Sequence, residues 1–434
     1  MKPLRIYLIF ILIVLLTIGF NLIARKIFKS HWNLRLGFGI PALFMILFMW
    51  RVSQPVELFS DFHKAYYPAG KLILQNPSAI FGENGLGETV YGFVNIPIIA
   101  LLFTPFSLLD RPAAHFLLVV VSGLALLLTL YCLFQLISTS KGNQIGVLGL
   151  FVINGPLYYS LREGNSTHIV LPLLAAALVC LKREREIWSG VLVALAALIK
   201  LPILLLCAYF FLRMQRKVIL GISITLITVF GLSLVGFGID LHINWFQECI
   251  LNYMGKPLAA YNNQSIDGFL ARLLTDDNLF NWEPLRLGLI FKVLKYAITA
   301  LLIGCTLAIF LQSKSPTTLQ TQNLEFSIVL CLSILISPIS WSHYYLLLLL
   351  PLSLYIGNGL SVPNGYNWLI SIVLSILLIS PPVLRFSHSN PMINFLISKL
   401  FISHYFLGGL VLFGVLLLAQ YLSRKPNTPP LIIR

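Results

Sequence analysis

Long apolar runs recur from one end of the chain to the other, and they constrain the fold more than any other feature. Most approach the length that an α-helix needs to cross a bilayer. A membrane barrel would instead show short segments of alternating hydrophobicity. The runs fall at 4–24, 36–50, 93–109, 113–137, 145–161, 169–181, 187–212, 218–238, 286–311, 326–339, 342–357, 368–384 and 403–422. Since only 10% of the residues are charged, a soluble domain is excluded, and we predict an all-α polytopic membrane protein.

Short basic loops between the runs predict the orientation, because Lys and Arg in such loops favour the cytoplasmic side. They also account for the net charge of +15 without nucleic acid. The basic residues are Arg25, Lys26, Lys29, Arg35, Lys182, Arg183, Arg185, Arg213, Arg216, Lys217, Arg424 and Lys425. Run 187–212 lies between two such loops, so we predict a hairpin that turns at Lys200-Leu201-Pro202, where proline breaks the helix. Run 93–109 contains Asn95, Pro97 and Pro105 and is predicted to be re-entrant or interfacial.

This topology predicts one membrane domain over 1–434 with about 12–13 transmembrane helices and external juxtamembrane helices. A first external loop covers 51–112, a long external loop covers 239–285, and a cytoplasmic tail covers 423–434. Residues 4–24 are too long and too apolar for the core of a signal peptide, so we expect a membrane anchor there. Most of the acidic residues fall on the external face, where we expect the chemistry.

The stretch Ser60–Gly70 holds an acid inside a block of polar and aromatic residues, directly after an apolar run. Asp61 is followed by Tyr66 and Tyr67 on a segment that reads as an amphipathic surface helix. One interpretation is that Asp61 only caps that helix. The other is that a carboxylate fixed at the membrane surface takes the proton of an attacking hydroxyl group.

Three further polar groups fall on the same predicted face. Arg162-Glu163-Gly164-Asn165 is either a helix stop or a turn that binds sugar or phosphate. Lys200 stands in a long apolar run, which is unfavourable unless the ammonium is paired or reaches water. It either extends to the interface or holds a lipid phosphate. His343, in the turn Ser337–Tyr345, belongs either to an aromatic belt or to a phosphate or hydroxyl contact beside Asp61.

The long external loop contains the polar stretch 262–268. Asn263 and Gln264 are candidates for hydrogen bonds to a sugar, and Ser265 or Asp267 is the alternative as a helix cap. The six cysteines are scattered, and the external loops contain no Asp-x-Asp pair. We therefore expect neither a metal site nor a cofactor.

Several of these motifs occur together in the order of a known family. They are Asp61-Phe62 with Tyr66-Tyr67, Asn95-Ile96-Pro97 leading to Phe103-Thr104-Pro105, Glu163-Gly164-Asn165, Gly190 to Lys200-Leu201-Pro202, Asn263-Gln264-Ser265, and Ser337-Pro338-Ile339-Ser340-Trp341-Ser342-His343-Tyr344. Over roughly 55–355 the chain resembles glycosyltransferase family 87, polyprenol-phosphate-mannose-dependent transferases of the GT-C superfamily. The resemblance implies that Asp61 is the general base and that Lys200 and His343 contact the donor phosphate.

The sequence therefore predicts a multi-pass glycosyltransferase of the cell membrane with its active site outside. It would move a sugar, mannose by resemblance, from a polyprenyl phosphate to a hydroxyl of a lipid or glycan acceptor. Arg162 is a further phosphate contact, and the predicted substrate contacts are Tyr66, Tyr67, Asn165, Asn263, Gln264 and Trp341. A secondary transporter is the alternative, although it should show two similar halves and acids within the spans. A non-catalytic scaffold would need no polar external cleft.

Overall fold

The computed structural model describes residues 58–423 except 82–89, 91, 139, 277, 313–315, 317 and 384–388. Within those residues every element is helical, and an isolated bridge between Asn263 and Trp341 is the one extended pairing. The predicted all-α polytopic fold is confirmed. The apolar runs 4–24 and 36–50, the first basic loop, the tail from 424 onwards and the acids Glu57, Glu83 and Glu88 lie outside the described residues.

Five helices of the described chain are long and apolar enough to cross a membrane. They are α5 (Arg111–Leu136), α11 with the π-helix η5 (Arg216–Leu251), α13 (Leu289–Gln312), α14 (Leu319–Ile336) and the continuous segment Pro391–Leu422, which holds α17, η7, η8 and α18. Six shorter apolar helices accompany them, at Pro97–Ser107, Thr167–Lys182, Glu186–Ile199, Leu201–Leu212, Ser342–Ile356 and Tyr366–Ile379. The number of crossings that the sequence predicts stays a prediction.

The run 145–161 is not one straight helix. It forms α6 (Lys141–Ile153) and α7 (Gly155–Glu163), which are bent by 53° and count as one further span only as a pair. Asn154 causes the break, because its side chain accepts the Leu157 amide at 2.7 Å and so starts a new helix. A side chain at Gly155 would meet the Ser380 carbonyl oxygen at 2.6 Å, so only glycine allows this close approach.

The run 187–212 breaks where its sequence predicts. Helix α9 (Glu186–Ile199) ends at Lys200, the 3₁₀ turn η4 covers Leu201–Ile203, and α10 covers Leu204–Leu212. The run 93–109 forms a 3₁₀ helix, η3 (Pro97–Phe103), followed by the short α4 (Thr104–Ser107). That segment is too short to rank among the long spans, and its membrane position stays a prediction.

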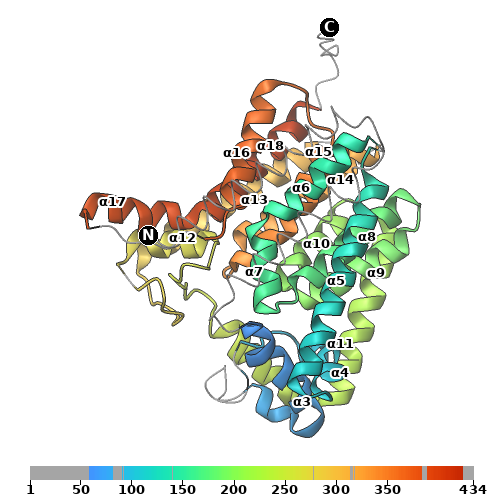
Figure 1. Cartoon of the computed structure of the whole chain (residues 1–434), viewed down its shortest axis with the longest axis vertical. Helices are drawn as coiled ribbons and strands as arrows, with labels where there is room; N and C mark the ends of the chain where they lie inside the picture. Colours follow the sequence, from blue (N-terminus) through green and yellow to red (C-terminus); the bar gives the residue numbers. More distant parts are fainter. Residues whose placement is uncertain are drawn as a thin grey trace, which may run out of the picture.

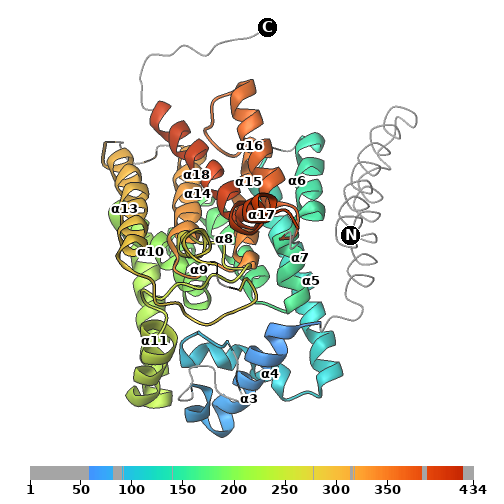
Figure 2. The ribbon, with the colours of Figure 1, turned by 90° about the vertical axis from the view of Figure 1, so that its left-hand side faces the viewer.

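The described part of 51–112, the loop predicted to be external, contains short helices that gather at one end of the molecule. They are η1 (Phe62–Tyr66), α3 (Tyr67–Gln75) and η2 (Pro77–Ile80). Figures 1 and 2 show α3 and α4 at the opposite end from α16 (Tyr366–Ile379). Aromatic side chains join η1 to η3, since Tyr66 of η1 stacks on Phe103 of η3 with ring centroids 4.4 Å apart.

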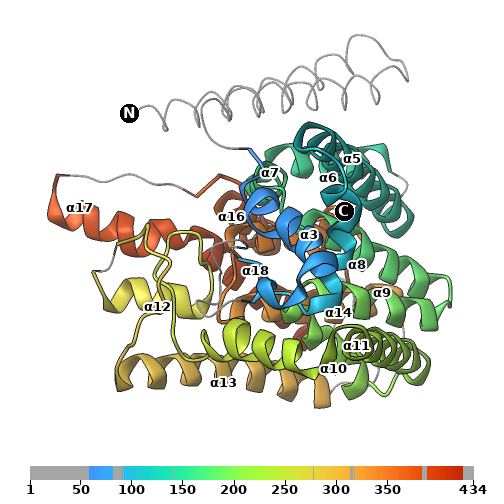
Figure 3. The same cartoon turned by 90° about the horizontal axis from the view of Figure 1, so that it is seen from below.

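A second group of elements projects from one side, as Figures 1 and 3 show for α12 (Ile266–Leu274) and α17 (Pro391–Phe395). Ser265 caps α12 by accepting the Gly268 amide at 3.0 Å, which confirms one of the two predicted caps. The chain then returns to the centre through η7 (Leu396–Leu400), η8 (Phe401–Ser403) and α18 (His404–Leu422).

The interior lies between α8 (Thr167–Lys182), α9, α14, α18 and the broken helix η6–α15 (Ser342–Leu348, Leu349–Ile356). One charged group is completely buried there. Glu325 of α14 accepts hydrogen bonds from Tyr209 at 3.0 Å and from Gln420 at 2.9 Å, and it forms an ion pair with Arg213. These bonds connect α10, α14 and α18.

Candidate active site

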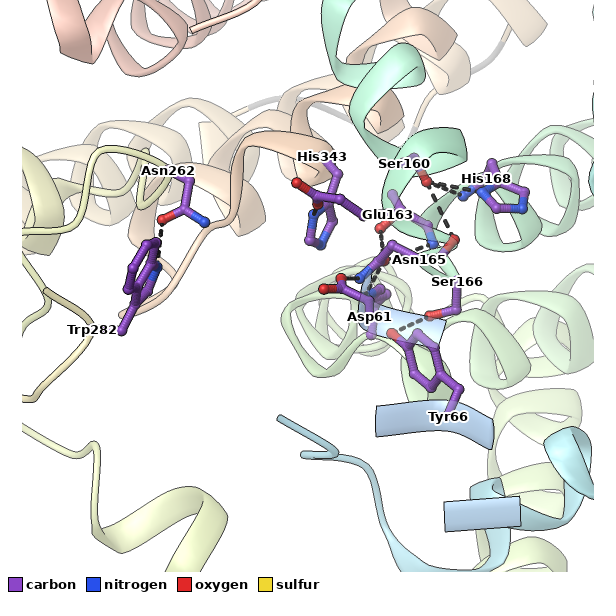
Figure 4. A network of polar contacts seen from close by, with 12 residues as sticks. Asp61, Tyr66, Ser160, Glu163, Asn165, Ser166, His168, Asn262, Trp282 and His343 are labelled. Carbon is purple, nitrogen blue, oxygen red and sulfur yellow. Dashed lines mark hydrogen bonds and ion pairs between the residues drawn. The ribbon is translucent and has the colours of Figure 1, made fainter. Parts of the chain in front are cut away.

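A tight turn at the end of α7 positions the first part of the site. The helix stops at Gly164, whose φ of 66° is left-handed and favours glycine. The turn packs against η1, since a side chain at Gly164 would meet the Phe62 Cβ at 2.8 Å. The Phe59 amide also donates to the Arg162 carbonyl at 2.6 Å. Asp61, at the start of η1, is thereby held against Glu163 and Asn165 (Figure 4).

Asn165 links the predicted base to the predicted cation. Its amide nitrogen donates to the Asp61 carboxylate at 2.7 Å, and its amide oxygen accepts from the Lys200 ammonium at 3.0 Å. The Thr167 hydroxyl and backbone amide donate to the same oxygen at 2.8 and 3.1 Å, which fixes the orientation of the amide group. The ammonium is buried and lies 4.6 Å from the centre of the Tyr344 ring.

His343 enters the site from η6. Its Nδ1 lies 3.3 Å from Oε2 of Glu163, and its Nε2 is buried without a hydrogen-bond partner. One ligand atom each of Asp61, Glu163 and His343 lies within 4.8 Å of the other two, a spacing that could hold a cation. The sequence analysis offered a position of His343 beside Asp61, but it did not indicate that Glu163 approaches both.

Two effects raise the pKa of Asp61 above the ordinary value for a carboxyl group. Burial is the larger, because it disfavours the charged form. The nearby Glu163 carboxylate adds to it by repulsion. His343, the Asn165 hydrogen bond and Lys200 act in the opposite direction but do not outweigh them. A carboxyl group with a raised pKa binds a proton more strongly when it is ionised, which suits a general base.

Some of the other predicted site residues lie beside the Asp61–Glu163–His343 group, and others lie apart from it. The Tyr66 hydroxyl is 3.2 Å from the Ser166 hydroxyl, and the Tyr67 hydroxyl donates to the Leu109 carbonyl at 2.8 Å. Arg162 lies beside Tyr158. Four of the predicted residues therefore come together, namely Asp61, Asn165, Lys200 and His343. Among the described residues, no contact is seen between these four and Tyr67 or Arg162.

The side-chain amides of Asn263 and Gln264 form hydrogen bonds within the protein. The Asn263 side chain donates to the Leu258 carbonyl at 3.1 Å and accepts the Ser340 amide at 3.0 Å. The Gln264 side chain donates to the carbonyls of Tyr261 and Ile402, each at 2.8 Å. Both residues are buried. They hold the long loop against the turn before His343, where Trp341 pairs with Asn263, and a sugar contact for either stays a prediction.

A comparison with protein families identifies the family of this chain. The model of glycosyltransferase family 87 matches residues 93–338, more than half of the 434-residue chain. The chain belongs to glycosyltransferase family 87. Membership makes it a membrane glycosyltransferase, with a sugar donor and an acceptor as substrates, and confirms the family that the motifs predicted. No curated protein matches the sequence.

The family match covers only part of the site. Glu163, Asn165 and Lys200 lie inside the matched range, whereas Asp61 precedes it and His343 follows it. The structure joins the three parts through the contacts described above. A family 87 enzyme must bring an acceptor hydroxyl and a donor together, and this cluster combines carboxylates, a cation and a histidine at one place.

Proposed function

We propose that the protein transfers mannose from a polyprenyl phosphate to a hydroxyl of a lipid or glycan acceptor, at the external face of the cell membrane. The observation that carries the proposal is the Asp61–Asn165–Lys200 connection, with bonds of 2.7 and 3.0 Å. It holds a carboxylate and an ammonium at a fixed separation. Such a pair suits the transfer of a sugar from a phosphate, because one group can activate the acceptor while the other binds the phosphate.

In the proposed reaction, Asp61 takes the proton of the acceptor hydroxyl as its oxygen attacks the anomeric carbon of the donor. The bond between that carbon and the phosphate oxygen breaks on the opposite side. Its electron pair leaves on the polyprenyl phosphate, so the configuration of the sugar inverts. The proton finally passes from Asp61 to solvent. Phosphate is a fair leaving group, so this chemistry does not demand a metal ion.

Lys200 is suited to the phosphate because it is a buried point charge. An ammonium has three N–H donors, and Asn165 takes one of them. Burial disfavours the charged form, whereas the Tyr344 ring, 4.6 Å away, favours it by a cation–π contact. Negative charge develops on the phosphate as the bond breaks, so a fixed cation there stabilises the transition state more than the bound donor.

The proposal is tested with purified protein in lipid nanodiscs and radiolabelled short-chain polyprenyl-phosphate sugars. Mannose and glucose donors are compared, with extracted membrane lipids as acceptors. We expect label to move from the mannosyl donor into an acceptor, and the product to have the inverted configuration. Activity with nucleotide sugars but not with prenyl phosphates would contradict the donor class. The transporter alternative predicts donor flux in proteoliposomes without any transfer.

A further inference from the structure

The contact between Glu163 and His343 fixes which ring nitrogen carries a proton. Oε2 of Glu163 lies 3.3 Å from Nδ1 of His343. An ionised carboxylate can only accept a hydrogen bond, so Nδ1 must carry the hydrogen. The other nitrogen, Nε2, then bears a lone pair when the ring is neutral. The Glu163 side chain is 20% exposed and the His343 side chain 5%, so the pair is largely shielded from water.

Nε2 of His343 is the feature that points to a ligand. It is buried and lacks a hydrogen-bond partner, which is unfavourable for a polar atom unless something binds there. The ring belongs to the same cluster as Asp61 and Glu163. As a lone-pair acceptor Nε2 would repel a phosphate oxygen, but once protonated it would donate to that oxygen, with Glu163 stabilising the imidazolium from the other side.

We propose that Glu163 and His343 form a carboxylate–histidine pair that takes up one proton when the donor phosphodiester binds. The proton comes from solvent and adds to Nε2, which then donates to a non-bridging phosphate oxygen. Glu163 is a positioning residue, since it orients the ring and stabilises its charge without touching the donor. This inference rests on the phosphate donor of the proposed function and adds how that donor is recognised.

The surrounding charges determine the direction of the pH dependence. The titratable groups that face His343 are Glu163 of α7, Asp61 before η1, Lys200 after α9, His168 of α8 and the neighbouring Tyr344. Burial and then Lys200 disfavour the imidazolium, whereas the Asp61 carboxylate favours it. The Glu163 carboxylate lies 3.3 Å from the ring nitrogen Nδ1. A bound phosphate adds a further negative charge and shifts the balance toward protonation. Binding coupled to proton uptake becomes weaker as the pH rises.

The experiment uses a short-chain prenyl methyl phosphate diester, which carries one negative charge throughout the range of pH 5.5–8.5. Any pH dependence of its binding therefore arises from titratable groups of the protein. Calorimetry on the full chain in nanodiscs, in buffers with different ionisation enthalpies, gives both Kd and the number of protons taken up. We expect uptake that is largest near pH 5.5 and declines as the pH rises, because burial disfavours the imidazolium. Kd should rise toward tenfold per pH unit in the range where free His343 is neutral and bound His343 is protonated.

Variants assign the proton. Glu163→Gln should abolish most of the uptake and weaken binding of the diester about tenfold or more, and Glu163→Asp should restore part of both. His343→Gln should bind weakly and without pH dependence. Glu248→Gln is the matched control, because Glu248 of η5 accepts a hydrogen bond from Asn252 and does not belong to the Asp61–Glu163–His343 group. It should bind the diester as the natural protein does.

Several results would overturn the inference. Unchanged uptake in Glu163→Gln would remove the role of that carboxylate. Uptake that persists in His343→Gln but disappears in Lys200→Met would place the proton on the lysine. Diester binding that requires Mn²⁺ and is lost with chelator would mean that the three ligand atoms hold a cation instead. Binding with no proton uptake refutes only this inference, whereas no binding at any pH also refutes the phosphate donor.

Discussion

At the scale of single residues, Asp61 and Glu163 are two carboxylates with different neighbours. Asp61 accepts a hydrogen bond from Asn165, and Glu163 contacts the His343 ring. The Glu163 carboxylate helps to raise the pKa of Asp61, so the two residues are electrostatically coupled. The base must be ionised to accept a proton, and turnover is therefore expected to fall as the pH drops through the pKa of Asp61.

Glu163→Gln tests this coupling. It removes a negative charge beside Asp61, which favours the ionised carboxylate, so the pKa of Asp61 should fall. The acidic limb of the profile of kcat against pH should move to lower pH, while donor affinity also weakens. The profile is measured at saturating donor for Glu163→Gln and for the control Glu248→Gln. An acidic limb at the same pH in both variants would contradict the coupling.

Lys200→Met tests the phosphate contact. Methionine keeps the length and apolar character of the side chain but removes the charge. A hydrogen bond to a charged group contributes roughly 1.5–3 kcal/mol, so donor KM should rise about 10- to 100-fold, with little change in acceptor KM. Steady-state kinetics with each substrate varied in turn measures both. An unchanged donor KM would mean that Lys200 only supports Asn165 and Tyr344.

The sequence predicted some of these residues better than others. Asp61, Lys200 and His343 were assigned through the family resemblance, and they do come together. The substrate contact of Asn165 stays a prediction, and the structure adds that its side-chain amide links Asp61 to Lys200. The role of Glu163 toward His343 was missed, because 180 residues separate the two and no local pattern indicates such a pair.

At the scale of helices, polar residues decide where the apolar segments begin and break. The break at Lys200 was predicted from Pro202. The break at Asn154 was missed, although Asn154-Gly155-Pro156 carries both a helix cap and a proline at the start of the next helix. The run 326–339 began just after Glu325, so the charged centre of the interior was also missed.

Glu325→Ala tests that centre. The change would leave the Arg213 guanidinium largely buried without its carboxylate, and breaking a buried ion pair typically costs about 3–5 kcal/mol. The Tyr209 and Gln420 bonds would be lost as well. We expect a clearly lower Tm in detergent, monitored by thermal unfolding. Ser371→Ala serves as control because Ser371 is only half-buried and its hydroxyl donates to the Asn367 carbonyl of its own helix, α16. An equal Tm in both variants would contradict the stabilising role.

At the scale of the whole molecule, the pattern of hydrophobicity predicted an all-helical membrane protein, and the fold agrees. The gathering of short helices around Asp61 could not be predicted from periodicity, because it depends on tertiary contacts such as the bond between the Phe59 amide and the Arg162 carbonyl. The orientation remains a prediction from the Lys and Arg loops.

Single-cysteine labelling tests that orientation. Glu184 is exposed in the loop between α8 and α9, and the basic residues around it favour the cytoplasmic side. In a variant without its natural cysteines, Glu184→Cys should react with an impermeant thiol reagent only after the cells are opened. A cysteine in place of exposed Asn252, in the loop predicted to be external, should react in intact cells. The reverse pattern would invert the topology.

The central claim is that Asp61 takes the acceptor proton, and Asp61→Asn tests it most directly. Asparagine keeps the shape and caps a helix about as well as aspartate, but it cannot accept the proton. A positioned base contributes about 10²–10⁴-fold in rate, so kcat should fall by roughly that factor while the protein still inserts and binds the diester. Near-normal kcat in Asp61→Asn, together with a large loss of kcat in Glu163→Gln, would assign the base to Glu163 and contradict the account.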